Sequence, residues 1–134
     1  MLQEIDILVS EVGPRDGLQS IKRIMATQDK LDWIKALAAS GIREIEVGSF
    51  VSPRLLPQMA DSATLVNETN KIDNLMVLAL VPNLKGAELA VAAGARKLTI
   101  PPSASHAHSI KNIGKTPEEA IEEVRRICMF RDNL

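Results

Sequence analysis

The segment of this sequence best suited to chemistry is Gly13-Pro14-Arg15-Asp16-Gly17, in which two charged residues stand between residues that shape the backbone. Glycine and proline limit such a turn to a few conformations and so hold the charged side chains in place. Asp16 offers a hard oxygen ligand for a divalent cation. Arg15 offers a rigid, forked donor for a carboxylate or another oxyanion. An ordinary Asp-Gly turn with an Arg–Asp ion pair at the surface also fits, and this segment alone favours that simpler interpretation without excluding the other.

A second candidate is Glu46, which stands between the apolar residues Ile45 and Val47. If this stretch is a strand, alternation sends the two apolar side chains to one face and Glu46 to the other. In a closed barrel that other face is the interior, where a carboxylate must be paired, hydrogen-bonded or functional. In an edge strand it would simply be exposed to solvent, and the pattern permits both.

Histidine and cysteine give weaker signals. His106 and His108 are two residues apart, which on a strand would direct both imidazoles to one side as a metal pair requires. The prolines before them and Lys111-Asn112 after them favour an exposed loop instead. Cys128 lies on the apolar stripe of a predicted helix and is expected to be a buried, unreactive thiol. Glycine-rich nucleotide loops, Cys-x-x-Cys pairs and Gly-x-Ser-x-Gly turns do not occur in the sequence.

The elements that must position these residues alternate between strand and helix. Short β-branched or apolar runs predict strands over residues 5–12, 44–47, 75–81 and 97–100. Apolar spacings of three and four predict a helix after each strand. These helices run from Thr27 to Gly41, from about Asp61 to Lys71, from Asn83 to Gly94 and from Thr116 onward. Successive βα units predict an α/β fold with a parallel sheet, either a small open sheet or half of a (β/α)₈ barrel.

Each predicted strand is followed by a polar cluster. Sites in parallel α/β folds lie beyond the carboxyl ends of the strands. The sequence therefore predicts one site built from all four of the loops that follow the strands. The clusters cover residues 11–19, 46–53, 82–83 and 103–108.

Composition narrows the class of protein. The chain has 134 residues, 46% of them apolar, which suits one packed domain. With 16 Lys and Arg against 17 Asp and Glu, it lacks the basic excess that nucleic-acid binding needs. There is no apolar run of the ~20 residues that a membrane helix requires. The N-terminal residues resemble neither a signal nor a transit peptide, and the single cysteine suits a reducing compartment, so we expect a cytoplasmic protein.

Several segments together resemble the hydroxymethylglutaryl-CoA lyase family. They occur in the family's order and spacing, from about Ile7 to Val124. They are Glu11-Val12-Gly13-Pro14-Arg15-Asp16-Gly17-Leu18-Gln19, Ser49-Phe50-Val51-Ser52-Pro53, Pro57-Gln58-Met59-Ala60-Asp61, Pro82-Asn83-Leu84-Lys85-Gly86, Ala90-Val91-Ala92-Ala93-Gly94-Ala95 and Lys111-Asn112-Ile113.

The resemblance implies a metal-dependent carbon–carbon lyase on a (β/α)₈ barrel that cleaves 3-hydroxy-3-methylglutaryl-CoA to acetoacetate and acetyl-CoA, usually in leucine degradation. It implies that Asp16 binds Mg²⁺ or Mn²⁺ and that Arg15 contacts the acyl-CoA substrate and steadies the developing enolate. It implies catalytic roles for Glu46 and Glu11 near the reacting centre. The remaining implied substrate-binding residues are Gln19, Ser49, Asn83 and Ser105.

The resemblance also implies that this chain is incomplete as a catalyst. In the family two metal-binding histidines, a metal-binding asparagine and a catalytic cysteine lie on later strands, and His106, His108 and Cys128 do not occupy their places. We therefore expect residues 1–134 to be the N-terminal portion of a lyase barrel, four of its eight βα units, with the C-terminal half absent. Exposed sheet edges then predict a homo-oligomer or marginal stability, and no lyase activity from the isolated chain.

Two other functions remain open at this point. A Claisen-type synthase acting on a 2-oxo acid and an acyl-CoA belongs to the same superfamily and shares the Arg-Asp pair after the first strand. A truncated, non-catalytic assembly fragment would explain the missing ligands.

Overall fold

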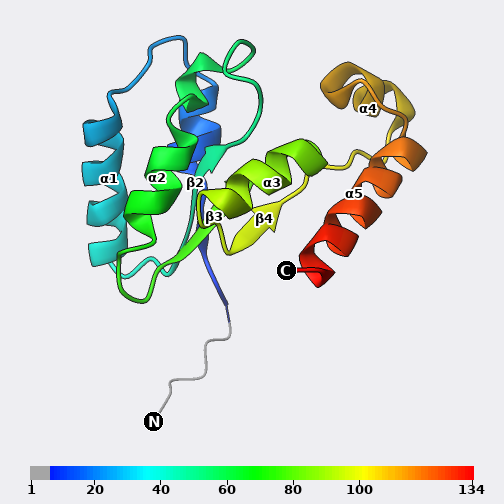
Figure 1. The fold of residues 1–134 in the computed structure, drawn as a ribbon. Coiled ribbons are helices and arrows are strands. Elements are labelled where there is room, and N and C mark those ends of the chain that lie inside the picture. Colours follow the sequence, from blue (N-terminus) through cyan, green and yellow to red (C-terminus); the bar gives the residue numbers. More distant parts are fainter. Residues whose placement is uncertain (1–6) are drawn as a thin grey trace.

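The computed structural model describes residues 7–134, which form a parallel sheet with α1, α2 and α3 across one face (Figure 1). The strands lie side by side in chain order and are β1 (Ser10–Glu11), β2 (Glu44–Ser49), β3 (Met76–Leu80) and β4 (Lys97–Thr99). The helices are α1 (Thr27–Ala39), α2 (Ser62–Thr69), α3 (Leu84–Ala92), α4 (His106–Ile113) and α5 (Pro117–Asp132), with the short helical turns η1 (Gly13–Gly17) and η2 (Pro57–Met59).

The predicted α/β class and the four βα units are confirmed, and the main difference in the strands lies at the start. The described part of the first strand covers Ser10–Glu11 rather than extending to Val12, and residues 5 and 6 lie outside the described residues. Val12 has φ −116° and ψ 0°, so the chain already turns into η1 there. Residues 7–9 are exposed and form no strand.

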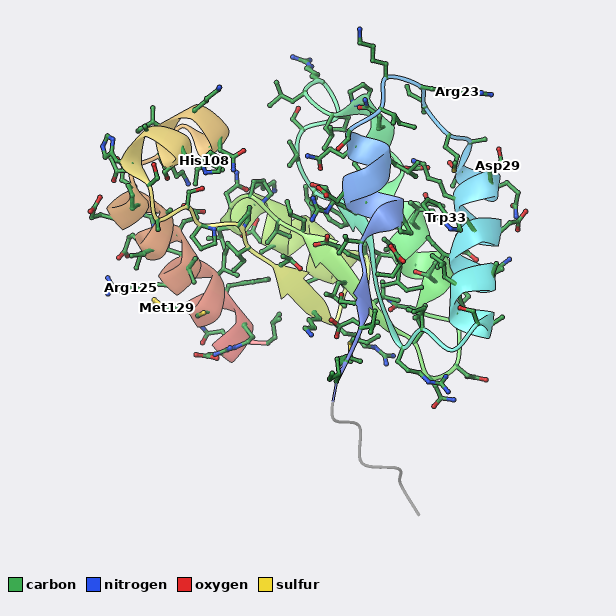
Figure 2. All side chains as sticks on the ribbon, turned by 180° about the vertical axis from the view of Figure 1, so that it is seen from behind. Arg23, Asp29, Trp33, His108, Arg125 and Met129 are labelled. Carbon is green, nitrogen blue, oxygen red and sulfur yellow. The ribbon has the colours of Figure 1, made fainter. Side chains whose placement is uncertain are left out.

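The prediction of a loop around the histidines is wrong, because residues 106–113 form the helix α4. Ser105 caps it by accepting a hydrogen bond from the His108 N–H at 3.4 Å, and Gly114 ends it with φ +68°. The two histidines are exposed, and residues two apart on a helix do not face the same side, so they form no metal pair (Figure 2). The missed signal was the pair Ser105 and Gly114, set too close together to stand out as a helix.

The two faces of the sheet differ in chemistry. The face toward the helices is apolar: Ile45 and Val47 of β2 and Val77 of β3 are fully buried against Ile34 of α1 and Leu65 of α2. Burial of such side chains contributes about 1.5–3 kcal/mol each. This layer is the hydrophobic core and fixes which side of each strand faces the helices.

The opposite face of the sheet, which we call the inner face, carries charge. Glu44 and Glu46 of β2 point to it, alongside Leu78 of β3, and all three are buried. Lys97 of β4 donates to the Glu44 carboxylate at 2.7 Å, so this ion pair spans β3 and ties β2 to β4. The burial of Glu46 confirms the interior rather than the exposed interpretation of its position.

A buried cation connects α1 to the loop that follows β2. Lys30 is 1% exposed, and its Nζ donates to the Gln58 carbonyl at 2.6 Å and to Asp61 Oδ1 at 2.7 Å. Thr27 donates to the other oxygen of Asp61 at 2.8 Å. The loop between β2 and α2 is thus held at its far end by α1.

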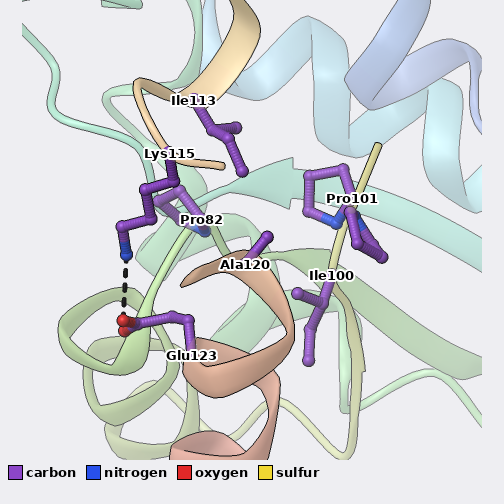
Figure 3. Close-up of a pocket in the computed structure, with 8 residues that line it drawn as sticks. Pro82, Ile100, Pro101, Ile113, Lys115, Ala120 and Glu123 are labelled. Atoms are coloured by element: carbon purple, nitrogen blue, oxygen red, sulfur yellow. Dashed lines mark hydrogen bonds and ion pairs between the residues drawn. The ribbon is translucent and has the colours of Figure 1, made fainter. Parts of the chain in front are cut away.

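Glu123 of α5 links that helix both to the start of α3 and to Lys115, and Figure 3 shows the contact with Lys115. Glu123 Oε1 accepts from the Leu84 N–H at 2.7 Å, and its Oε2 accepts from Lys115 Nζ at 2.9 Å. The space beside them, lined by Pro82 and Ile100, is about 10 Å³, room for a single water molecule. This junction is therefore packing between elements rather than a ligand site.

No helix within residues 7–134 combines the length and the apolarity that crossing a bilayer demands.

Removing the buried cation should destabilise the fold. Lys30→Met leaves the largely buried Asp61 carboxylate without its cation, and we expect the free energy of unfolding to fall by about 3 kcal/mol in urea titrations. Lys35→Met on the same helix changes an exposed side chain and should stay within about 0.5 kcal/mol. Equal effects of the two substitutions would contradict a special role for Lys30.

The α5 junction should be sensitive to acid. The Leu84 N–H and then Lys115 hold the pKa of Glu123 below its ordinary value. A lowered pKa in the folded state stabilises the protein above the unfolded pKa of about 4.3, and this stabilisation is lost as the pH falls through the folded pKa. Glu123→Gln should therefore cost about 1–2 kcal/mol at pH 7, and the deficit should shrink below pH 4. Glu122→Gln, an exposed neighbour, serves as the control.

Candidate active site

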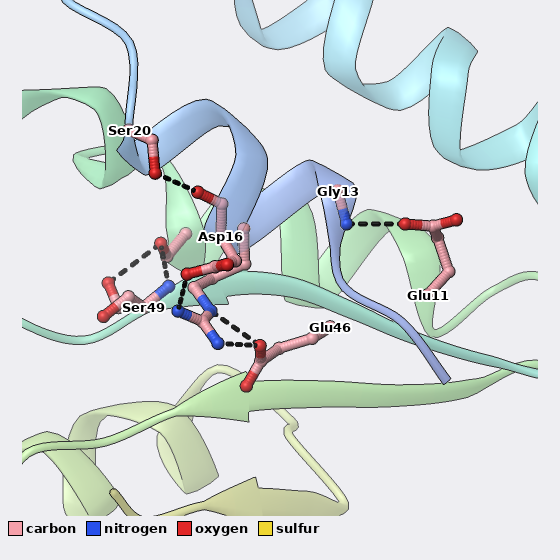
Figure 4. A network of polar contacts seen from close by, with 8 residues as sticks. Glu11, Gly13, Asp16, Ser20, Glu46 and Ser49 are labelled. Carbon is pink, nitrogen blue, oxygen red and sulfur yellow. Dashed lines mark hydrogen bonds and ion pairs between the residues drawn. The ribbon is translucent and has the colours of Figure 1, made fainter. Parts of the chain in front are cut away.

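The centre of the candidate site is an ion pair between Arg15 and Glu46 (Figure 4). Arg15 Nε donates to Glu46 Oε2 at 2.6 Å, and Nη2 lies 2.5 Å from the same oxygen. The Glu46 side chain is 2% exposed and the Arg15 side chain 13% exposed. The second carboxylate oxygen, Glu46 Oε1, is buried and has no hydrogen-bond partner among residues 7–134. A buried charge of this kind is tolerated only beside an opposite charge, which Arg15 supplies.

Asp16 completes the cluster from the solvent side. Its Oδ1 accepts from Arg15 Nη1 at 2.9 Å, while the side chain as a whole is 59% exposed. Arg15 thus lies between a buried and an exposed carboxylate, so the predicted surface Arg–Asp pair is present. A ligand-binding role for Arg15 and Asp16 stays a prediction. Of the five N–H donors of Arg15, two remain for a ligand.

The turn η1 places Arg15 and Asp16 directly after β1. Their backbone N–H groups donate to the Val12 carbonyl at 3.1 and 2.7 Å. A side chain on Gly13 would come within 3.1 Å of the Trp33 ring, so the turn packs closely on α1 only because this residue is glycine. The predicted tight turn is therefore a short helical turn.

Glu11 does not join this cluster. It accepts a hydrogen bond from the Gly13 N–H at 2.6 Å, and in the sheet it lies opposite Ile45, whose side chain is in the helix-facing core. Its carboxylate therefore points away from Glu46 (Figure 4). In this structure Glu11 stabilises the start of the turn through its hydrogen bond with Gly13. The catalytic role of Glu11 stays a prediction.

An open cavity of about 750 Å³ lies at the carboxyl ends of the strands, next to Arg15. Each strand's following segment contributes to its wall, which bears out the expectation that the polar clusters share one place. The polar residues that line it are Arg15, Asp16 and Gln19 after β1, Ser52 after β2, Asn83 after β3, and His108, Asn112 and Lys115 after β4.

The other predicted substrate-binding residues divide into two groups. Gln19 and Asn83 line the cavity, although Asn83 Oδ1 is already occupied by the Gly86 N–H at 2.9 Å as the cap of α3. Ser49 is buried in β2 and does not line it, and its hydroxyl has no partner among the described residues. Ser105 is exposed and caps α4. Substrate contacts by these four residues stay predictions.

Sequence reasoning missed Lys115 and Asn112 as cavity residues. Both belong to the stretch after β4 whose helix was not predicted, so nothing placed them near Arg15. Lys115 also holds Glu123 of α5, and the cavity wall is therefore coupled to that helix.

The described residues supply too few oxygen ligands for a complete metal centre. Among residues 7–134 no three His, Cys, Asp or Glu side chains gather closely enough to hold an ion. Mg²⁺ and Mn²⁺ prefer about six oxygen ligands. Asp16 can contribute one of them, because it is exposed and only Oδ1 is engaged by Arg15.

The two carboxylates that bind Arg15 should differ in their contribution to stability. Glu46→Gln removes the buried partner and should lower the free energy of unfolding by about 3 kcal/mol, with faster amide hydrogen exchange over residues 13–18. Asp16→Asn changes an exposed partner and should cost less than about 1 kcal/mol. The reverse order would show that the buried pair does not hold η1.

Comparison with known proteins places this site in a family. The family model described as HMGL-like matches residues 6–133. The chain is 44% identical over 121 residues to the mitochondrial hydroxymethylglutaryl-CoA lyase of Gallus gallus, covering 90% of this chain and 41% of that protein. Other relatives carry mitochondrial and cytoplasmic names. The chain thus spans about two fifths of the chicken relative's length, and its own location stays a prediction.

Solved structures agree with the sequence comparison. The HMG-CoA lyase of Bacillus subtilis superposes with a TM-score of 0.88 at 35% identity, covering 96% of this chain and 44% of that chain. An Acinetobacter baumannii HMG-CoA lyase, solved with coenzyme A and 3-methylmalate, gives 0.84 at 37% identity, over 90% of this chain and 39% of that one. The parallel sheet therefore matches part of a (β/α)₈-barrel lyase. With its sequence, its fold and almost its whole length in agreement, the chain belongs to the HMGL-like family of hydroxymethylglutaryl-CoA lyases.

Proposed function

We propose that this chain forms the Arg15 wall of a lyase site that cleaves 3-hydroxy-3-methylglutaryl-CoA to acetoacetate and acetyl-CoA. The observation that carries the proposal is the position of Arg15, held by a buried carboxylate at the edge of a large cavity in a chain of this family. Coenzyme A in the structure of the Acinetobacter relative supports an acyl-CoA as the substrate class.

The reaction breaks a carbon–carbon bond and leaves its electron pair on the carbon next to the thioester. That charge spreads onto the thioester oxygen as an enolate, and a fixed donor at this oxygen lowers the barrier. Arg15 suits this task because Glu46 and Asp16 fix its guanidinium while two N–H groups stay free. In this arrangement Glu46 acts through Arg15 as a positioning residue.

The cavity also suits the charge of the substrate. Lys115 lines it together with Arg15, and these two cations can balance the carboxylate of the acyl group or the phosphates of coenzyme A. His108 adds imidazole nitrogens that can form hydrogen bonds with the substrate. Gln19 and Asn83 add amide groups that can bind polar atoms of the substrate.

Among the described residues, we assign only Asp16 as a ligand of a divalent cation. This carboxylate would be one of its ligands, and the other ligands would come from outside the described residues. When bound, such an ion makes a substrate hydroxyl easier to deprotonate.

The test uses the chain alone and the chain extended with the C-terminal part of the Bacillus subtilis relative. We expect no acetoacetate from the chain alone, because it offers one metal ligand, and measurable acetoacetate from the extended protein. In the extended protein Arg15→Lys should lower kcat/KM about 100-fold, since lysine cannot reproduce the fork. Arg23→Lys, which changes an exposed loop arginine, should leave it unchanged.

Two results would contradict the proposal. One is an active extended protein whose rate does not respond to Arg15→Lys. The other is turnover of a 2-oxo acid with acetyl-CoA in place of cleavage, which would favour the Claisen-type synthase.

A further inference from the structure

The segment between β2 and α2, residues 50–61, forms one wall of the cavity next to Arg15. The residues of this segment that line the cavity are Val51, Ser52, Leu55 and Leu56. The Leu55 side chain is 78% exposed, so it has little packing of its own to hold it. The position of this wall therefore depends on how the two ends of the segment are held.

The beginning of the segment is fixed by a serine of α2. Ser62 Oγ accepts a hydrogen bond from the Ser49 N–H at 2.9 Å and donates to the Met59 carbonyl at 2.7 Å. A side chain on Gly48 would overlap Ser62, so β2 and α2 approach this closely only because residue 48 is glycine. The start of α2 is thus tied to the carboxyl end of β2.

The other end of the segment is held by Lys30 of α1. Its Nζ binds the Gln58 carbonyl and Asp61 Oδ1, and the second oxygen of Asp61 accepts a hydrogen bond from Thr27. Three hydrogen bonds therefore connect α1 to residues 58–61, which lead directly into α2. Lys30 is 1% exposed and does not line the cavity, so any effect that it has on a bound substrate passes through Gln58 and Asp61.

Gln58 extends this connection to a second wall of the cavity. Its Nε2 donates to the Ile21 carbonyl at 2.7 Å, while its own carbonyl is bound by Lys30. Ile21 belongs to the segment after β1, which places Arg15 and Gln19 at the cavity. Both segments leave the sheet at the same end (Figure 1). The walls after β1 and after β2 are thus joined through one residue, whose backbone is fixed by a buried cation.

The charge of Lys30 suits placement better than stability. A buried ion pair contributes little to stability on balance, and replacing both partners with neutral residues of similar volume is often harmless. The ammonium group, however, fixes the direction of two oxygens, one from Gln58 and one from Asp61. An apolar side chain in the same space could fill it but could not orient these two groups.

We propose that Lys30 is a positioning residue of the candidate active site: through Gln58 and Asp61 it fixes the walls after β1 and after β2 relative to each other. The inference rests on the proposed function, since it assigns these two walls to the binding of the substrate. Lys30 touches no substrate itself but sets the spacing of the walls. Loss of this spacing weakens substrate binding and leaves the ion pair of Arg15 and Glu46 unchanged.

The first experiment measures amide hydrogen exchange by NMR in the chain itself and needs no lyase activity. The double substitution Lys30→Met and Asp61→Asn removes both charges, so no buried carboxylate loses its partner. We expect exchange about tenfold faster in residues 55–60, where four amides donate within the segment, and unchanged exchange in β3. Unchanged exchange in residues 55–60 would overturn the proposal.

Two single substitutions serve as comparisons in the same experiment. Gln58→Met breaks only the bond to the Ile21 carbonyl and should speed exchange in residues 18–22 alone. Lys97→Met removes the cation that binds the buried Glu44, also at 2.7 Å, at the amino end of β2. It should destabilise the fold without selective exchange in either wall. Equal effects of Lys97→Met and of the double substitution on the segment after β2 would overturn the proposal.

The second experiment measures steady-state kinetics in the protein extended with the C-terminal part of the Bacillus subtilis relative. The double substitution should raise KM about tenfold and leave kcat within about twofold, because Lys30 acts on the walls and not on the reacting atoms. Loss of folded protein would instead lower the apparent kcat with KM unchanged, and that result would overturn the positioning role. An extended protein that is inactive with Lys30 intact would contradict the proposed function, whereas hydrogen exchange would still decide whether Lys30 holds the walls.

Discussion

The structure depends on the need to neutralise a carboxylate on a central strand. Glu46 lies on β2 with strands on both sides, so water cannot solvate its carboxylate. A cation must therefore neutralise it. Arg15 is that cation, and it reaches Glu46 only because η1 begins immediately after β1. The residue that the fold requires for charge balance is therefore also the residue that faces the cavity. Stability and the placement of the candidate site follow from one contact.

The same constraint acts at the other end of β2. Glu44 is buried on the inner face and takes Lys97 of β4 as its partner across β3. On the inner face, two carboxylates of β2 thus bind cations from opposite directions along the sheet, one from the segment after β1 and one from β4. An apolar face toward the helices and a charged inner face leave the strands one permitted orientation, because a shift by one residue would bury both carboxylates in the core. The charges therefore specify the register of the sheet as well as contributing to a site.

Patterns over a few neighbouring residues predict those structural features that depend on neighbouring residues alone. Alternation around Glu46 predicts its inward direction, and the sequence around Thr116 predicts the start of α5, which has the expected capping box. Contacts between distant segments leave no such pattern. Lys30 is a lysine on an amphipathic helix until Asp61 is brought next to it, and Glu123 resembles any exposed helix glutamate until Leu84 presents its N–H. These pairs depend on the packing of whole elements, which spacing along the chain does not encode.

The polar clusters after the strands show why location is easier to predict than role. A strand's carboxyl end is followed by the start of a helix, and helix starts select Ser, Thr, Asp and Asn as caps. Asn83 and Ser105 are caps in this structure. Each side chain already accepts a hydrogen bond from a backbone N–H in the first turn of α3 or α4. Polar residues at this edge therefore have two physical causes, capping and ligand binding, and both produce the same sequence pattern. The pattern locates the cavity, whereas only the direction and burial of each side chain distinguish Arg15, which faces the cavity, from Ser105, which does not.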